Sequence, residues 1–174
     1  MKGMSTPEND VVDAIVREWS TVRSDIDATP LAVFSRIKRI SKQLDLLRRQ
    51  CFAKAGLEPS EFDVLSALRR SDDPLGLTPK QLLASNLVSS GTMTNRIDRL
   101  VRRGLVTREH DPTDGRSILV RITPLGIELV DEAITLLLRE EEALLGGVDS
   151  DDVEALARGL RILALHMGES EIEI

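Results

Sequence analysis

The stretch LGLTPKQLLASNLVSSGTMTNRIDRLVRRGLVTREHDPTDGRSILVRI, residues 75–122, decides the fold. Near its start, Thr78 can cap a helix that begins at Pro79, and Gln81 stands three residues after the cap. A hydroxyl cap, a proline in first position and a glutamine in third position together satisfy the free amide donors of a helix start. The sequence therefore predicts a short helix over about 78–86.

A second helix follows after a break. The small polar residues and glycine of 86–91 are typical of a turn, and Ser89 or Ser90 can serve as the next cap. We expect this helix over about 90–103. Its apolar residues, spaced by three and four, predict the side that faces the core: Met93, Ile97, Leu100 and Val101.

A neighbouring stripe of the second helix is rich in arginine. It holds Thr92, Arg96, Arg99 and Arg103. Between 96 and 103 there are four arginines and a single acid, Asp98. We interpret this stripe as a cationic outer face, whose mutual repulsion requires an anionic partner such as the DNA backbone. The alternative is a charged helix face in solvent.

The chain then predicts a β-hairpin. Gly104 can end the helix in a left-handed conformation, and strands are expected over 105–109 and 117–122. The tip between them is rich in turn residues and projects Arg116, which can reach a DNA minor groove. The alternative is a surface loop in which Arg116 pairs with a neighbouring aspartate. Helix, turn, helix and hairpin in this order are typical of a winged helix-turn-helix in a mainly α protein.

Four segments between Leu57 and Gly126 resemble the MarR family of transcriptional regulators: EFDVLSALRR, SSGTMTNRIDRLVRRGLVTRE, DPTDGRS and ITPLG. The resemblance implies a homodimer that binds pseudo-palindromic duplex DNA, represses transcription and is released by a small anionic or phenolic ligand. It implies that the wing contact comes from Arg116, with Gly115 where many relatives carry a second arginine. The implied major-groove residues are Ser89, Ser90, Thr92, Thr94, Asn95 and Arg99. Arg96 and Arg103 join them as members of the arginine stripe.

Charge is distributed unevenly along the chain. The 174 residues carry a formal net charge of −6, which by itself argues against a DNA-binding protein. Residues 31–127, however, hold 17 Lys and Arg against 10 Asp and Glu, while 128–174 hold three against 13. DNA affinity depends on the charge that faces the phosphates, so the basic middle region is compatible with DNA binding.

The terminal regions predict long amphipathic helices that join two chains. Three stripes repeat by threes and fours, in the manner of helices that pack against partner helices. They are Val33, Ile37, Ile40, Leu44, Leu47 and Cys51; Ile127, Val130, Ile134, Leu137 and Leu138; and Val153, Leu156, Leu160, Leu163 and Met167. We divide the chain into 1–56 with the first dimerisation helix, 57–122 with the DNA-binding region, and 123–174 with the C-terminal dimerisation helices. The alternative is a monomeric bundle.

An additional helix is expected over residues 8–27, with the only tryptophan, Trp19, in its apolar stripe. This resembles the urate-responsive MarR subfamily, in which a Trp, an Asp and an Arg form the ligand site. The matching residues are Trp19, Asp63 and Arg96, and Ser71 stands where these relatives carry an asparagine. The resemblance implies a small anionic effector, either urate or a tricarboxylate such as citrate or trans-aconitate.

Arg96 lies at the border of the buried stripe, so it can turn toward Asp63 or toward a phosphate. Our hypothesis is that an anionic ligand takes Arg96 from Asp63, shifts the recognition helix and lowers DNA affinity. Two alternatives stay open. In one, Asp63 and Arg96 form an ordinary salt bridge and Trp19 is a core residue; in the other, the protein is a ligand-independent DNA-binding dimer.

The remaining residues give little support to catalysis. His110 and His166 are the only histidines and lack the spacing of metal ligands, and no nucleotide-binding motif is present. We expect no cofactor and no metal, and a small helical enzyme is the least favoured interpretation. The single Cys51 lies in an apolar stripe and predicts a buried, inert thiol rather than a redox sensor. No signal-like or membrane-spanning segment is recognisable, so we expect a cytoplasmic protein without a membrane partner.

The apolar stripes predict the mass of the particle in solution. Light scattering at micromolar concentration should give about twice the chain mass of 19.2 kDa, because two chains are needed to cover these stripes. A mass equal to that of one chain would contradict the dimer.

Overall fold

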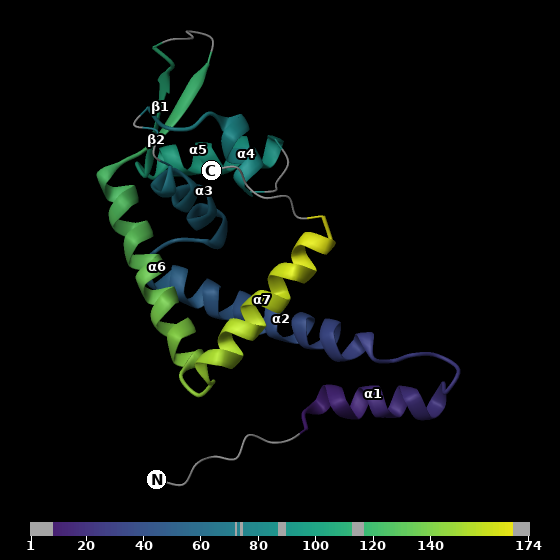
Figure 1. Ribbon diagram of the computed structural model, residues 1–174. Helices are drawn as coiled ribbons and strands as arrows, with labels where there is room; N and C mark the ends of the chain where they lie inside the picture. The colour runs from purple at the N-terminus through teal and green to yellow at the C-terminus, as the bar shows by residue number, and fades with distance from the viewer. Residues whose placement is uncertain (1–8, 72, 74, 87–89, 113–116, 169–174) are drawn as a thin grey trace, which may run out of the picture.

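The structure is a computed structural model that describes residues 9–71, 73, 75–86, 90–112 and 117–168. Helices α3, α4 and α5 gather with a β-hairpin at one end of the molecule, and the longer helices extend away from it (Figure 1). The elements are α1 (Val11–Val22), α2 (Pro30–Lys54), α3 (Pro59–Arg70), α4 (Pro79–Asn86), α5 (Ser90–Arg102), β1 (Val106–His110), β2 (Ile118–Ile122), α6 (Pro124–Leu145) and α7 (Ser150–His166).

The helix-turn-helix and hairpin are confirmed. The amide of Thr78 donates to Gln81 Oε1 at 2.8 Å, and the amide of Gln81 donates to Thr78 Oγ1 at 3.2 Å, which is the reciprocal cap that the sequence predicts before α4. Gly104 follows α5 with a φ of +69°, the left-handed conformation expected of it. Strands β1 and β2 pair antiparallel with Val106 opposite Ile122. The predicted tip with Arg116, and Ser89 in the turn, lie outside the described residues.

The core lies beneath this winged unit. The rings of Phe52 from α2 and Phe62 from α3 are stacked with centroids 4.0 Å apart, and Met93, Ile97 and Leu100 of α5 are fully buried beside them. Val101 was expected in the same stripe, and that prediction is wrong because its side chain is 38% exposed. Around the helix axis, Met93, Ile97 and Leu100 lie within about 60° of one another, and Val101 lies about 40° outside this sector, on the side of Ile97.

The long helices leave much apolar surface open. On the predicted stripes, Val33 and Ile40 of α2, Leu138 of α6 and Leu156 of α7 are each about half exposed. No described residue of α7 is buried. Within one chain, Cys51 of α2 and Val130 and Leu137 of α6 are buried, whereas the residues named above stay open, so one chain covers its apolar stripes only in part.

Helix α1 lies against the first part of α2, at the far end of the molecule from the hairpin (Figure 1). It is shorter than the predicted 8–27, because local hydrogen bonds after Val22 compete with the helix: Arg23 pairs with Asp25, and Asp27 accepts from the amide of Thr29.

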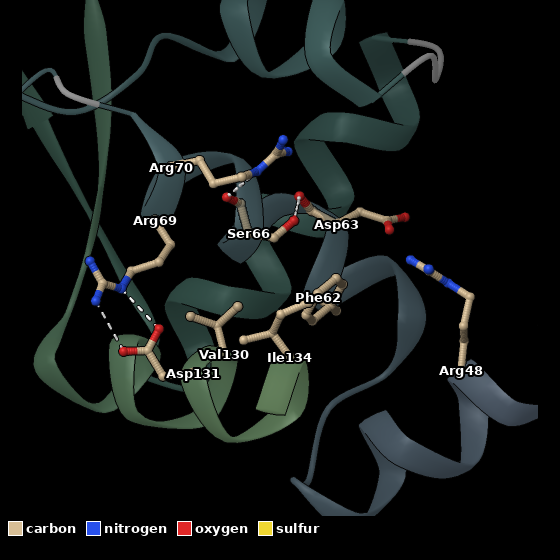
Figure 2. A pocket seen from close by; sticks show the side chains of 9 residues that line it. All are labelled: Arg48, Phe62, Asp63, Ser66, Arg69, Arg70, Val130, Asp131 and Ile134. Carbon is tan, nitrogen blue, oxygen red and sulfur yellow. Dashed lines mark hydrogen bonds and ion pairs between the residues drawn. The ribbon is translucent and has the colours of Figure 1, made fainter. Parts of the chain in front are cut away.

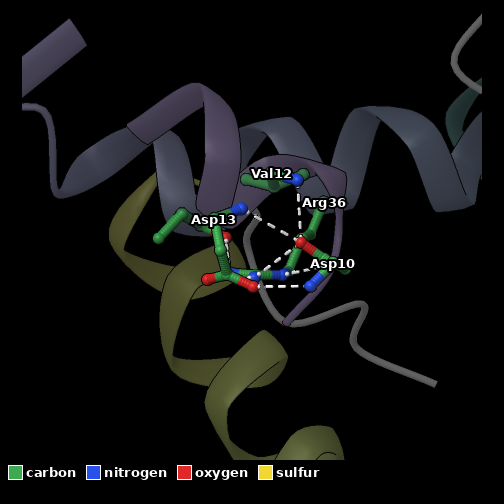
Figure 3. A network of polar contacts seen from close by, with 5 residues as sticks. Asp10, Val12, Asp13 and Arg36 are labelled. Atoms are coloured by element: carbon green, nitrogen blue, oxygen red, sulfur yellow. Dashed lines mark hydrogen bonds and ion pairs between the residues drawn. The ribbon is translucent and has the colours of Figure 1, made fainter. Parts of the chain in front are cut away.

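One arginine fastens α1 to α2. The Arg36 guanidinium contacts Asp10 at 2.9 Å and Asp13 at 2.8 Å (Figure 3). It also donates to the carbonyl of Ala32. Asp10 is at the same time the cap of α1 and accepts from the amides of Val12 and Asp13. The hydrogen bond from Arg36 lowers the pKa of Asp10 to about 2, so both interactions depend on an ionised carboxylate.

The Asp10–Arg36 contact predicts that acid releases α1. Because the folded-state pKa of Asp10 is depressed below its ordinary value of 3.8, its stabilising contribution is present above that value and is lost as the pH falls toward about 2. Trp19 is the only tryptophan, so its fluorescence should change over this pH range. Arg36→Gln should show the acid spectrum already at neutral pH, with the helix content of α2 to α6 retained. An unchanged spectrum in Arg36→Gln would contradict this role.

No helix among the described residues is both long enough and apolar enough to cross a membrane.

Candidate DNA-binding interface and ligand pocket

Helix α5 presents polar residues on the side away from the core. Thr92, Thr94 and Asn95 are exposed, as a major-groove surface requires. Ser90 begins the helix. The backbone of α5 is therefore placed as the sequence predicts, with an exposed polar face opposite Met93, Ile97 and Leu100.

The arginine stripe of α5 has partners within the chain. Arg99 contacts Glu58 at 2.6 Å and Glu61 at 3.0 Å, and Arg103 pairs with Glu61. Carboxylates of α3 and its cap therefore supply part of the anionic partner that the sequence predicts for this stripe. The partners are 41 and 42 residues apart in sequence, so helical periodicity within α5 does not reveal them.

Glu61 is the centre of this contact and the only charged residue buried among the described ones, with 1% of its surface exposed. One oxygen accepts from the amide of Glu58 at 2.9 Å and from Arg103, and the other lies 3.0 Å from Arg99 Nε at an angle short of a hydrogen bond. Arg103 also donates to the carbonyl of Gly56 at 2.8 Å. A buried carboxylate needs such compensation, so these contacts fix α5 to the start of α3.

Sequence reasoning overlooked one residue of this surface. Arg102 is exposed and, at about 100° per residue, lies almost opposite the buried side of α5. It makes no ion pair with another described residue. The same periodicity places Arg96 and Arg103 on the flank that faces α3. A helical projection of α5 could have identified Arg102 as its most outward cation.

A cavity of about 420 Å³ lies between α2, α3 and α6. Figure 2 shows the apolar side chains of Phe62, Val130 and Ile134 between polar groups on either side. The polar lining residues are Arg48, Asp63, Ser66, Arg69, Arg70 and Asp131. The volume and the mixed lining suit a small, flat molecule that carries charge.

The arginines around the cavity differ in their partners. Arg69 and Asp131 form a two-bond pair at 2.9 and 3.1 Å, which lowers the pKa of Asp131. The Arg70 Nε donates to the carbonyl of Ser66, and the Arg48 guanidinium lies over the ring of Phe52 at 5.4 Å. Neither Arg48 nor Arg70 pairs with a described carboxylate. Both cations can therefore receive an anion.

The structure brings together part of the predicted ligand site. Asp63 lines the cavity, and its carboxylate is 3.4 Å from the Arg96 guanidinium of α5. Ser71 ends α3 outside the lining, and its hydroxyl accepts from the amide of Asp73 at 3.2 Å. Trp19 is 47% exposed on α1 and does not line the cavity of its own chain. Arg48, Ser66 and Arg70 were not anticipated, since they come together only when α2 packs beside α3.

The cysteine and the two histidines do not line this cavity. Cys51 is buried, and desolvation raises the pKa of its thiol, as the predicted inert cysteine requires. His110 and His166 are exposed on β1 and at the end of α7. Within the part of the chain that the structure describes, no three His, Cys, Asp or Glu residues are grouped to hold a metal ion.

Helices α3 to α5 followed by a two-stranded wing, with an exposed polar face on α5, define a winged-helix DNA-binding protein. Residues 55–117 match the MarR family model, and the chain belongs to the MarR family of transcriptional regulators. It is accordingly a DNA-binding regulator and not an enzyme.

Three comparisons illustrate the relationship. The chain is 29% identical to the HTH-type transcriptional regulator PecS of Dickeya dadantii over 81% of this chain and 85% of that protein. It is 31% identical to the uncharacterized HTH-type transcriptional regulator YkoM of Bacillus subtilis over 64% of this chain and 70% of that protein. The solved structure of Bordetella bronchiseptica BpsR, whose DNA binding is regulated by 6-hydroxynicotinic acid, superposes with a TM-score of 0.65 at 25% identity, over 80% of this chain and 94% of that chain.

Burial of Cys51 makes a simple chemical prediction. A disulfide reagent that releases a coloured product on reaction with thiolates should leave the native protein unlabelled at neutral pH. The reason is that the Cys51 thiol is inaccessible and its pKa is raised. Urea should make one thiol per chain reactive. Rapid labelling of the folded protein would show that Cys51 is a reactive thiol instead.

Proposed function

We propose that this protein is a homodimeric repressor that binds a pseudo-palindromic operator and leaves it when a small anionic ligand enters the cavity between α2, α3 and α6. One observation carries the proposal. Asp63 lines the cavity and is also the partner of Arg96 on the recognition helix α5. A ligand that changes the environment of Asp63 therefore acts directly on the element that meets DNA.

The open apolar stripes support the dimer. Leu138, Leu156 and Leu160 are each about half exposed in one chain, and α7 buries none of its described residues. Covering them with a second copy removes this apolar surface from water. A two-fold dimer sets two copies of α5 about 34 Å apart, which corresponds to one turn of DNA and to an inverted-repeat operator.

The proposed DNA contacts follow the exposed side of α5. In addition to the predicted residues, Arg102 is included because it is the most outward cation of the helix. The proposed major-groove residues are Ser89, Ser90, Thr92, Thr94, Asn95, Arg99 and Arg102, and the wing contact is Arg116. Arg96 and Arg103 contribute to this surface by holding α5, since both pair with carboxylates of α3.

The cavity supports an anionic effector. Arg48 and Arg70 provide two cations on its wall, and Phe62 provides an aromatic face for a flat ring. An anion bound there competes with Asp63 for Arg96, whose guanidinium is at 3.4 Å and keeps 20% of its side-chain surface exposed. Relief of this pair shifts α5 and lowers DNA affinity. Urate, citrate and trans-aconitate remain the proposed effectors.

Membership of the urate-responsive subfamily is part of this proposal, supported by the Asp63–Arg96 pair, which joins two of the three residues that the family resemblance assigns to the ligand site. Trp19 lies on α1, away from the cavity of its own chain, so its participation requires the α1 helix of the second copy. Ser71 is proposed as a neighbour of the site, at the end of the helix that carries Asp63.

The test is a gel-shift titration on the DNA that flanks the gene, with and without urate, citrate and trans-aconitate. One effector should weaken operator binding by about 5- to 150-fold, the usual range of allosteric coupling. Asp63→Ala and Arg96→Ala should lose most of this response. Asp25→Ala, which breaks an exposed aspartate–arginine pair far from α5, is the matched control and should keep it.

Operator binding that no effector alters, together with unchanged behaviour of the Asp63 and Arg96 variants, would favour a ligand-independent DNA-binding dimer. In that case the Asp63–Arg96 contact is an ordinary salt bridge.

A further inference from the structure

The guanidinium of Arg99 is held by two carboxylates on two different edges. Its Nε lies 3.0 Å from Oε1 of Glu61. Its two terminal nitrogens, Nη1 and Nη2, lie 2.9 and 2.6 Å from the two oxygens of Glu58. Glu58 therefore binds the two terminal nitrogens of Arg99, which form the outer fork of the guanidinium, while Glu61 contacts Nε, its inner edge.

These two carboxylates differ greatly in exposure. The Glu61 side chain is 1% exposed and is also fixed by Arg103 and the amide of Glu58. The Glu58 side chain is 57% exposed, and the Arg99 side chain is 43% exposed. An exposed ion pair is weak and exchangeable, whereas a buried carboxylate with several donors is not. The hydrogen bond from Arg99 lowers the pKa of Glu58, so this carboxylate is ionised at neutral pH.

Arg99 is also the member of the arginine stripe that lies nearest to the exposed face of α5. At about 100° per residue, its position is roughly 50° from the middle of that face, compared with about 90° for Arg103 and about 110° for Arg96. A long side chain can cover this angle. The outer fork of Arg99 can therefore reach the region where a duplex docks against α5.

A carboxylate and a phosphate bind the arginine fork in the same geometry, with two parallel hydrogen bonds. We propose that Glu58 is an internal substitute for a DNA phosphate: it occupies the outer fork of Arg99 in the free protein and gives way to a phosphate of the duplex, while Glu61 keeps Arg99 in place through Nε. This inference rests on DNA binding, which the family supplies, and is independent of the effector and of the operator sequence.

The arrangement assigns opposite effects to two carboxylates only three residues apart. Removing the charge of Glu58 frees the fork of Arg99 and strengthens DNA binding. Removing the charge of Glu61 removes the ion pairs to Nε of Arg99 and Nη1 of Arg103, and DNA binding weakens because α5 loses its anchor. A purely structural role for both residues would weaken DNA binding in both variants.

The experiment measures the affinity of the full-length protein for a mixed-sequence DNA duplex by fluorescence anisotropy over a range of salt concentrations. Glu58→Gln should bind about two- to fivefold more tightly for each Arg99 that reaches the duplex, since that is the value of an exposed ion pair. The slope of the logarithm of its affinity against the logarithm of the salt concentration should also become steeper, by up to about one unit. In the unmodified protein, the freed Glu58 takes up a cation and offsets part of the counterion release.

Two controls separate this effect from a general loss of negative charge. Asp25→Asn removes the same charge from another exposed carboxylate–arginine pair and should leave DNA affinity unchanged. In an Arg99→Gln background, Glu58→Gln should have no effect, because the fork that it releases is gone. Tightening that persists without Arg99, or a Glu58→Gln variant that binds no more tightly than the unmodified protein, would overturn the proposal.

Glu61→Gln should bind the duplex more than tenfold more weakly, because removing one partner of a buried ion pair is strongly destabilising. Circular dichroism and thermal melting establish whether this variant is folded. If it is not, the Glu58 and Arg99 double-mutant cycle decides the proposal by itself.

Discussion

A buried carboxylate joins the two helices on which DNA recognition depends. Glu61 lies in the first turn of α3, is buried from solvent, and contacts Arg103, Arg99 and the amide of Glu58. An ionised group in such a place is tolerated only with several donors around it, and removing one of them leaves a costly uncompensated charge. The angle between α3 and α5 is therefore fixed by an interaction that fits one geometry well, rather than by apolar packing alone, which tolerates small rotations.

Helix α3 carries two functions on its two sides. Glu61 faces α5, while Phe62, Ser66 and Arg69 face the cavity beside α2 and α6. Asp63 belongs to both sides, since it lines the cavity and contacts Arg96. A short helix of 12 residues is stiff, so under the proposed mechanism a displacement at the cavity is passed to α5 as a movement of the whole helix. In that mechanism Asp63 is the residue through which the cavity acts on α5.

The sequence was sufficient for the winged unit because its signals are local. The cap at Thr78, the left-handed Gly104 and the spacing of Met93, Ile97 and Leu100 each act within one or two helical turns. The roles of the arginines were not accessible in this way, since Arg99 meets a partner 41 residues earlier in the chain. The cavity shows the same division: the Asp63–Arg96 pair was anticipated from a family pattern, whereas Arg48 and Arg70 come together only through the packing of α2 on α3.

The exposed apolar side of α7 affects how a newly synthesised chain folds. This helix of 17 residues buries none of its described residues, and isolated helices of such length are only marginally stable in water. Its folding is thus linked to encounter with whatever covers its apolar side, and mass action makes the fraction of ordered C-terminal helix rise with the concentration of that partner. If the partner is a second copy, the cell holds little complete regulator until enough chains have accumulated, and solitary chains present an unprotected end to proteases.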